Sequence, residues 1–493
     1  MRIFRFITVF LVFIATACQQ PETYDLVISN GRVIDPETKL DAIRNIGIQD
    51  GMIVDISRSS LKGHKNVDAS GLIVAPGFID IHTHSPTPIG VKFALLDGVT
   101  TQLDLEAGAY PVLAYGYLLE GKSPIHFGNS VSHMAIRIKV IQGQDAPYLF
   151  SPEGGMVPGA AFSQPATPAQ IQKMREMLED GLASGGIGIG VLLDYMTHAV
   201  SDKELEMIFE VAGAHKAPIA IHVRRGMPGD PQGLLEVIAL AEKTGAPVMI
   251  CHITHSAMHA VGDWLAEIDA ANQRGANITA ETLTYAAGGT AISADVFGRD
   301  WRRIFNIDYS DVQWTATGEW LNEEKWNYYR KNEPAGMINH HYIKEEWLEQ
   351  ALKWPRMMAS TDVTPAFSTD RLSNPNIAGT FSRLIGHYGR DQGLFDLSDA
   401  LARVSLFQAQ WLESSTPAFN KKGRIQLGMD ADIVIFDANR IQERADYGKP
   451  YQASDGIEHV IVAGKLVMTS GKINASVLPG QRLKNGIDHK TLH

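Results

Sequence analysis

Two patterns of apolar and polar residues divide the chain. Near both ends, short apolar runs alternate with turn residues. For example, the runs at 25–29 and 32–36 are separated by the dipeptide Asn-Gly, which begins at Asn30. Asn-Gly between two apolar runs is a strong signal for a β-hairpin. The same composition returns in residues 430–436 and 459–467. We therefore expect the two chain ends to form the halves of one small β-sandwich.

The middle of the chain repeats a different unit, an apolar strand-like run that is usually followed by a helical pattern. Thr167 and Ser201 mark two helix starts, because Gln170 and Glu204 follow them at the spacing of a capping box. The strand-like runs are residues 78–84, 100–106, 124–129, 187–192, 218–223, 247–252, 278–282 and 357–362. Eight such units predict an α/β fold, a (β/α)8 TIM-like barrel with its function at the carboxyl ends of the strands.

These patterns predict one large central domain and a smaller one made by both ends. We expect a signal peptide at residues 1–18, sandwich strands within 19–76 and 423–493, and the barrel at 77–422. The stretch at about 286–354 is too long for one connection and is rich in Trp, Tyr and charge. It therefore predicts a lid or wall over the functional site.

The first residues have the pattern of an export signal. Arg2 and Arg5 precede an apolar run at 6–14, and small residues then lead to Cys18. The run is too short for a stable transmembrane helix, so a removed signal peptide is expected. The segment resembles a bacterial lipoprotein signal, which implies a lipid on Cys18 as the only membrane contact; cleavage without a lipid is the alternative. Both predict export to the cell envelope, that is, the periplasm.

Composition narrows the classes of partner. A formal net charge of -11 without a Lys/Arg cluster argues against nucleic acid as a partner. Cys18 and Cys251 are the only cysteines, so no disulfide framework is available. We expect a small-molecule substrate, and the sequence predicts no particular oligomeric state.

Histidines and a carboxylate fall at the predicted strand ends. His82 and His84 are two residues apart in a strand and so project from the same face. His222, His252 and Asp362 each end a later predicted strand. Because the carboxyl ends of barrel strands meet on one face, this set predicts a divalent metal centre.

Two stretches carry a resemblance to a known family. The run Pro-Gly-Phe-Ile-Asp at 76–80, directly before the histidines, resembles the first barrel strand of the amidohydrolase superfamily. Residues 98–108 resemble the second strand of its D-aminoacylase branch, the N-acyl-D-amino-acid deacylases, where a cysteine holds the metal. Ala107 stands at that cysteine's place, so its neighbour Glu106 is the expected ligand and Asp104 the alternative. Since adjacent strand residues face opposite ways, a shift in alignment or an irregular strand is implied.

The resemblance implies a metal-dependent hydrolase that cleaves the amide C–N bond of an N-acylated amino acid or a similar small amide. One or two divalent ions, with zinc favoured, would activate water at His82, His84, Glu106, His222 and His252. Asp362 would be the general base, and Tyr285 or a nearby histidine would steady the oxyanion.

Two departures from the branch concern the substrate. The branch usually has His-His-Lys where this chain has His252-Ile-Thr, and an arginine where Asn376 stands. Both residues expected to contact the substrate carboxylate are therefore missing, and other residues would have to bind it. The candidates for substrate contact are Tyr195, His255 and Arg224, with Arg225, Arg302 and Arg303 as further arginines. Alternative functions are hydrolysis of a cyclic amide, ester or lactone, and ligand binding without turnover by a surface lipoprotein.

Overall fold

The computed structural model describes residues 23–150 and 159–487. The predicted signal peptide and the lipid site at Cys18 lie outside these residues. Within the described ranges, no helix combines the length and the apolar character needed to cross a bilayer.

The central domain is a parallel barrel, which confirms the predicted fold class. Its strands follow the order β17-β12-β11-β10-β9-β8-β7-β6. A parallel bridge from Thr83 to Val363 joins the chain beyond the first and last strands and nearly closes the barrel. The strands are β6 (Phe78–Asp80), β7 (Val99–Ala109), β8 (His126–Ser132), β9 (Ile189–Leu192), β10 (Ile219–His222), β11 (Val248–Ile250), β12 (Ile278–Thr282) and β17 (Met358–Ala359).

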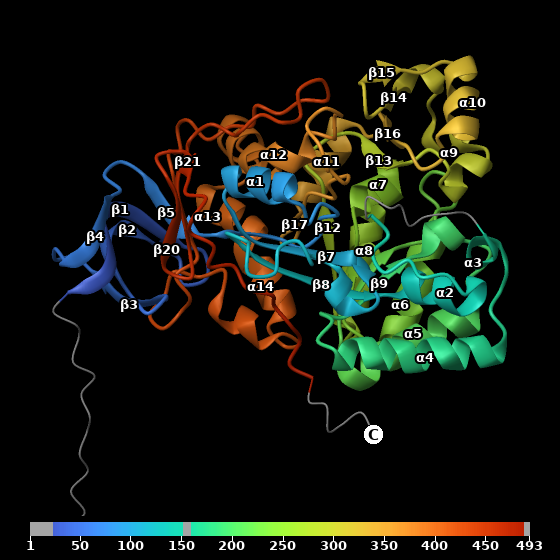
Figure 1. Cartoon of the computed structure of the whole chain (residues 1–493), viewed down its shortest axis with the longest axis horizontal. Helices are drawn as coiled ribbons and strands as arrows, with labels where there is room; N and C mark the ends of the chain where they lie inside the picture. Colours follow the sequence, from blue (N-terminus) through green and yellow to red (C-terminus); the bar gives the residue numbers. More distant parts are fainter. Residues whose placement is uncertain (1–22, 151–158, 488–493) are drawn as a thin grey trace, which may run out of the picture.

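Helices follow most of the strands and surround the barrel (Figure 1). Their buried apolar faces join the strand side chains in one large core. The longer helices are α1 (Pro88–Leu96), α2 (His133–Gln142), α4 (Pro168–Ala183), α5 (Asp202–His215), α6 (Gln232–Thr244), α8 (Val261–Gln273), α11 (Glu345–Leu352) and α12 (Asn376–Arg383). Shorter ones are α3 (Ala160–Ser163), α7 (Ile253–Ala257), α13 (Leu397–Leu401) and α14 (Phe407–Leu412), with π-helices η6 (Leu384–Asp391) and η7 (Ala402–Leu406).

The two predicted capping boxes differ in the structure. At the start of α4, Thr167 accepts from the Gln170 backbone N–H and the Gln170 side chain accepts in return. At α5, Ser201 caps the helix, but the Glu204 carboxylate is directed elsewhere. It pairs with Arg137 and lies 2.8 Å from His133 Nε2 in the core. The second box is therefore half formed, because the buried Arg137 and His133 side chains compete for the glutamate.

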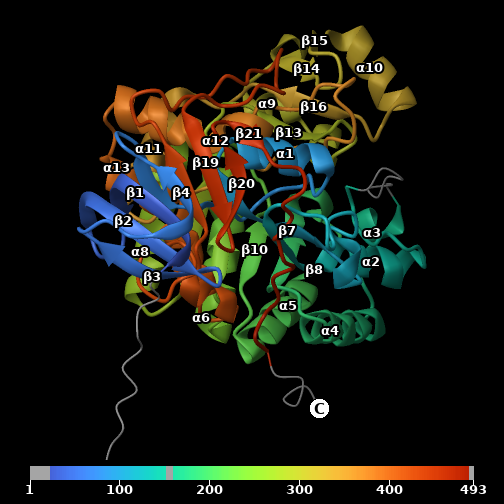
Figure 2. The ribbon, with the colours of Figure 1, turned by 60° about the vertical axis from the view of Figure 1, so that its left-hand side comes forward.

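Both chain ends build a second sheet beside the barrel, and Figure 2 shows its blue and red strands side by side. The antiparallel pair β5–β18 joins the two halves, with Pro76 opposite Ile433. The N-terminal strands are β1 (Tyr24–Asp35), β2 (Leu40–Gln49), β3 (Met52–Ser57), β4 (Gly63–Asp68) and β5 (Ile73–Pro76). The C-terminal strands are β18 (Ile433–Phe436), β19 (Ile457–Val462), β20 (Lys465–Thr469) and β21 (Lys472–Ile473).

The predicted hairpin at Asn30 is wrong. Residues 24–35 form the single strand β1, and both of its halves pair with β2. The register shifts between Ile28 and Gly31, where Asn30 has a φ of 62°. Asn-Gly supplies the left-handed backbone that either a turn or a β-bulge needs, and here the long partner strand selects the bulge.

The stretch after β12 folds into a small antiparallel sheet above the barrel, drawn in yellow in Figure 1. Its strands run in the order β13-β16-β14-β15, and stacked Trp301 and Trp326 lie in its own apolar cluster. These elements are β13 (Gly288–Ala291), η4 (Asp295–Gly298), α9 (Trp301–Phe305), β14 (Val312–Trp314), β15 (Glu319–Trp320), α10 (Glu323–Asn332) and β16 (Met337–His340).

Candidate metal centre

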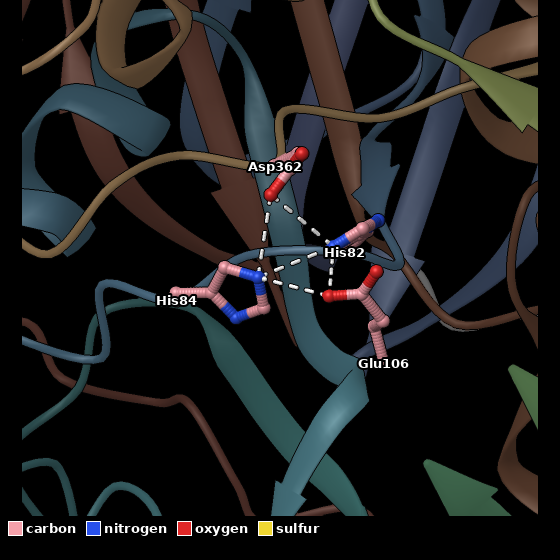
Figure 3. Close-up of side chains that lie close together, drawn as sticks. All are labelled: His82, His84, Glu106 and Asp362. Carbon is pink, nitrogen blue, oxygen red and sulfur yellow. Dashed lines mark hydrogen bonds and ion pairs between the residues drawn. The ribbon is translucent and has the colours of Figure 1, made fainter. Parts of the chain in front are cut away.

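Four side chains converge beyond the ends of the barrel strands (Figure 3). Oε2 of Glu106 lies 3.2 Å from His82 Nε2 and 3.4 Å from His84 Nε2. Oδ1 of Asp362 lies 3.3 Å from each of the same nitrogens. The two ring nitrogens are themselves 3.2 Å apart. Two imidazoles and two carboxylates therefore face one another within a single ion's reach.

The second oxygen of Glu106 faces another pair of histidines. Its Oε1 lies 2.9 Å from His252 Nε2 and 3.3 Å from His222 Nδ1. Glu106 thus stands between two histidine pairs, and one carboxylate serves both groups. This arrangement suits two adjacent cation positions that share a bridging ligand.

The donor set fits a divalent metal. The side chain of His82 is 0% exposed and that of Glu106 is 4% exposed, so both are removed from water. Burying carboxylates is costly unless cations or donors compensate them. Imidazole nitrogens and carboxylate oxygens converging in this way are the ligands that zinc takes in catalytic sites. The residues present therefore fit one or two divalent ions.

A further set of carboxylates holds the histidine rings from behind. His82 Nδ1 lies 2.9 Å from Glu281, and His84 Nδ1 lies 3.1 Å from Asp104. Such contacts fix which ring nitrogen faces a metal. Asp104 is therefore turned away from the centre, and its other oxygen accepts the backbone N–H groups of Ala107 and Gly108. Of the two candidates in the second strand, the structure brings Glu106 into the centre.

Two of the central residues have left-handed backbones. His252 has a φ of 33° and Asp362 a φ of 43°, which are unusual for residues other than glycine. Contacts hold both: the His252 N–H donates to Glu281 at 2.6 Å, and the Asp362 N–H donates to the carbonyl of His82 at 2.7 Å. Strain of this kind is concentrated at functional sites, where it directs side chains away from the regular strand geometry.

The electrostatic field of the cluster keeps its carboxylates ionised. Burial alone would raise the pKa of Glu106, but the charge of His82 and contacts with His222 and His252 hold that pKa well below its usual range. The pKa of Asp362 is likewise lowered, against burial, by His82 and His84. Burial dominates at Asp80, which bonds Thr361 behind the centre, and raises its pKa to about 7.

The centre opens into a pocket whose far wall comes partly from the small sheet. Tyr195 and Thr290 share a hydrogen bond of 2.7 Å there. His255 is 3% exposed, and neither of its ring nitrogens has a hydrogen-bond partner among the described residues. Burial lowers the pKa of His255 to about 3, so its ring is neutral. His255 is therefore a neutral polar group in the pocket wall.

Sequence comparison places the chain in a known family. A model of the amidohydrolase family matches residues 73–467. The chain belongs to this family. Two similar relatives are the N-acyl-D-glutamate deacylase and the D-aminoacylase of Alcaligenes xylosoxydans xylosoxydans, 27% and 26% identical. Each alignment covers 90% of this chain and 93% or 94% of the relative.

Solved structures agree on the architecture of this amidohydrolase. A D-aminoacylase crystal structure superposes with a TM-score of 0.77 at 21% identity. The N-acyl-D-glutamate deacylase of Bordetella bronchiseptica, complexed with zinc and a phosphonate inhibitor, gives 0.75 at 23% identity. Both comparisons cover 94% of this chain and 100% of the other. At these identities the likeness shows the shared fold.

The pocket of this amidohydrolase contains Arg225 in place of the predicted Arg224. Arg224 is held away from the pocket by Glu236 at 2.9 Å and by backbone carbonyls. Arg225 lines the pocket, 3.3 Å from Asp194 and stacked on the Phe305 ring. Adjacent residues in an extended chain point to opposite sides, so sequence spacing left the choice between the two arginines open. Arg302 and Arg303 do not line this pocket.

Tyr285 also lies elsewhere than predicted. Its hydroxyl donates to the carbonyl of Ala445 at 3.2 Å, and its ring lies beneath the Arg383 guanidinium. It is not among the described residues that line the pocket. The oxyanion role assigned to it therefore lacks a geometric basis, because the chain beyond β12 turns this side chain toward α12.

Asp194 is a pocket residue that sequence reasoning missed. It receives Arg225, and Arg299 from the small sheet lies 2.6 Å from its Oδ1. Its Oδ2 is also 3.8 Å from His222 Nε2, on the outer side of that ring. The strand pattern could have indicated Asp194, because it comes two residues after the end of β9, where a barrel places functional groups.

Proposed function

We propose that this amidohydrolase is a metal-dependent hydrolase that cleaves the amide C–N bond of an N-acylated amino acid or a similar small amide. The observation that carries the proposal is the position of Glu106 between two histidine pairs, with Asp362 beside the first pair. The names of the two similar relatives, a deacylase of N-acyl-D-glutamate and a D-aminoacylase, favour this substrate class.

The residues divide into ligands and a base. One or two divalent ions, zinc in the first place, would be held by His82, His84, Glu106, His222 and His252. Such an ion lowers the pKa of water toward about 7 and polarises a carbonyl oxygen. Asp362 lines the pocket, and its side chain is 16% exposed, so it can reach both water and substrate.

Proton transfer is the task of Asp362. Its carboxylate accepts a proton from the attacking water and returns it to the leaving nitrogen, which would otherwise depart as an unstable anion. His255 and the Tyr195–Thr290 pair offer hydrogen bonds to the polar parts of the substrate. The oxyanion role goes to the histidine alternative, at His255, because a neutral imidazole in the pocket can donate to a substrate oxygen.

Replacement of Asp362 tests the proposal. We expect Asp362→Asn to keep bound metal and to lower turnover of N-acetyl amino acids by about 10²-fold or more, because asparagine cannot accept the proton. Metal content, melting temperature and turnover should be measured on one preparation. Asp370→Asn, an exposed change a few residues away, is the matched control. If the Asp362→Asn variant retained most of its activity, the mechanism would be excluded.

Cyclic amides are the second candidate substrates. The D-hydantoinase of Ralstonia pickettii is 24% identical over 93% of this chain and 98% of its own length. Assaying hydantoins beside N-acetyl-D-amino acids separates the two classes. Faster ring opening than deacylation would transfer the assignment to the cyclic amides.

We also propose that the enzyme is exported to the periplasm and held at a membrane by a lipid on Cys18. The support is the charged, apolar and small-residue order of the first residues. Intact-mass measurement of the protein from membranes should show the lipid, and Cys18→Ser should abolish it. Recovery of an unmodified, soluble mature chain would contradict the anchor.

A further inference from the structure

Two hollows lie side by side at the top of the barrel. The pocket at the metal centre has a volume of about 50 Å³, and the groove beside it has a volume of about 610 Å³. Phe150, Met337 and Thr364 line both of them, so the two spaces are adjacent. The Phe150 ring also contacts the ring of His84, with 4.3 Å between centroids, so the groove begins one side chain away from the centre.

The two spaces differ in size and therefore in what they can hold. A water needs about 10–15 Å³ of such space, so the inner pocket has room for a few waters or one compact group. Pockets for whole small molecules measure roughly 300–1,000 Å³, a range that includes the groove. The bulky part of a substrate must therefore lie in the groove.

The walls also differ in chemistry. The groove is lined mainly by apolar groups, among them Leu149, Pro334, Pro365, Phe367 and Leu372. Among its described lining residues, charge is confined to Glu333 and Arg371, which pair with each other at 4.0 Å. The inner pocket instead presents the guanidinium of Arg225 and the free ring nitrogens of His255.

This contrast orients the substrate across the centre. An amide places its carbonyl at the catalytic centre and sends its acyl and amine parts to opposite sides. A charged amino-acid part would lose solvation in the groove and meet only Glu333 and Arg371, which already pair with each other, whereas an apolar acyl chain would gain by burial. The polar wall suits the amino-acid part, and the groove suits the acyl part.

We propose that the groove is an acyl-binding site and that the substrates are amides of long, unbranched, fatty-type acyl chains. The proposal rests on the proposed function, since it concerns the acyl side of the same amide. Burying one methylene is worth about 0.8 kcal/mol, or about fourfold in kcat/KM. Even with half of that gain for each of the six added methylenes, the preference for an octanoyl over an acetyl substrate should reach about 60-fold.

The test compares acyl chain lengths in wild type and in a variant with a filled groove. Ala335 is exposed and lines the groove, so Ala335→Trp fills it without displacing core side chains. N-acetyl, N-butanoyl and N-octanoyl forms of one D-amino acid should be assayed. We expect kcat/KM to rise with chain length in wild type, and the octanoyl-to-acetyl ratio to fall at least about fivefold in Ala335→Trp.

Ala475→Trp, an exposed alanine outside the groove, is the matched control and should leave the ratio unchanged. A flat chain-length profile in an enzyme that hydrolyses the acetyl substrate would overturn the groove proposal and leave the proposed function standing. An equal ratio in wild type and Ala335→Trp would also overturn it.

A binding measurement separates the two proposals if no N-acyl amino acid is hydrolysed. In that case the proposed function fails, and decanoate, the product of an acyl cleavage, serves as the probe for the groove. We expect calorimetry to show decanoate binding to wild type and binding at least about 10-fold weaker in Ala335→Trp. No binding, or equal binding by both proteins, would contradict an acyl site.

Discussion

At the scale of single residues, the second strand shows how two acidic side chains two positions apart acquire different tasks. Glu106 reaches into the centre, where one oxygen faces His82 and His84 and the other faces His252. Asp104 stays behind His84 and also accepts the hydroxyl of Tyr148 at 3.1 Å. The longer side chain is thus the bridge, and the shorter one orients a ligand.

This difference predicts unequal effects of two isosteric changes. Glu106→Gln removes the bridging charge and should release most of the bound metal. Asp104→Asn should weaken metal binding by about 10- to 100-fold, as the loss of a ring-orienting contact usually does, while saturating metal restores it. Elemental analysis after dialysis and a zinc titration give both values. If Asp104→Asn proved the more damaging change, the assignment of the bridge would be wrong.

At the scale of elements, an irregularity in β7 makes the bridge accessible. Against β8, its register moves from Asp104 opposite Asn129 to Ala109 opposite Val131, so five steps on one strand match two on the other. The extra residues form a bulge, which is how a strand redirects a side chain. Strand β9 makes room, because a Cβ on Gly190 would lie 2.2 Å from the carbonyl oxygen of Glu106.

Gly190→Ala should therefore damage the centre from a distance. The added methyl meets backbone, which cannot rotate aside, so we expect a loss of about 1–3 kcal/mol of stability and lower metal occupancy. Gly448→Ala is the control, since the nearest atom to its Cβ would be a side-chain oxygen at 3.4 Å. Melting curves and metal analysis of both variants test this expectation. Full metal content in Gly190→Ala would show that the bulge tolerates a closer neighbour.

At the scale of the whole molecule, the two halves of the terminal sheet are joined by β5–β18, and polar contacts at Glu37 also hold them together and connect them to the barrel. Both guanidinium arms of Arg424 reach Glu37, at 2.8 and 2.9 Å. Gln410 of α14 also donates to Glu37, at 3.2 Å. The hydrogen bonds from Arg424 outweigh burial, which alone would raise the pKa of Glu37, and lower that pKa to about 2. One carboxylate thus connects segments nearly 400 residues apart in the chain.

Acid should weaken this connection. A carboxyl whose pKa is lower in the folded chain stabilises it above the ordinary value of about 4.5, and this gain is lost as pH falls toward about 2. A third of the Glu37 side chain is exposed, so screening limits the gain to about 1 kcal/mol. Glu37→Gln should melt below wild type at pH 7, with the gap closing toward pH 3. Glu324→Gln on α10 is the control, and a gap independent of pH would contradict the role of charge.

The sequence by itself determined the features that depend on local pattern. The apolar runs before His82, His222, His252 and Asp362 were sufficient to predict parallel strands, because a buried strand needs a short continuous apolar run. Since barrel strands end on one face, the strand pattern alone was enough to expect those residues to meet. The joining of both chain ends in one sheet followed from their shared composition.

The tertiary structure alone decided what depends on neighbours distant in the chain. The bulge at Glu106 exists because Gly190 leaves space for it, and the bulge at Asn30 exists because β2 continues past that point. Arg225 rather than Arg224 enters the pocket because Asp194 and Glu236 each hold one of them. Local spacing predicts which groups arrive at a site, but packing and charge from other segments determine which way each side chain turns.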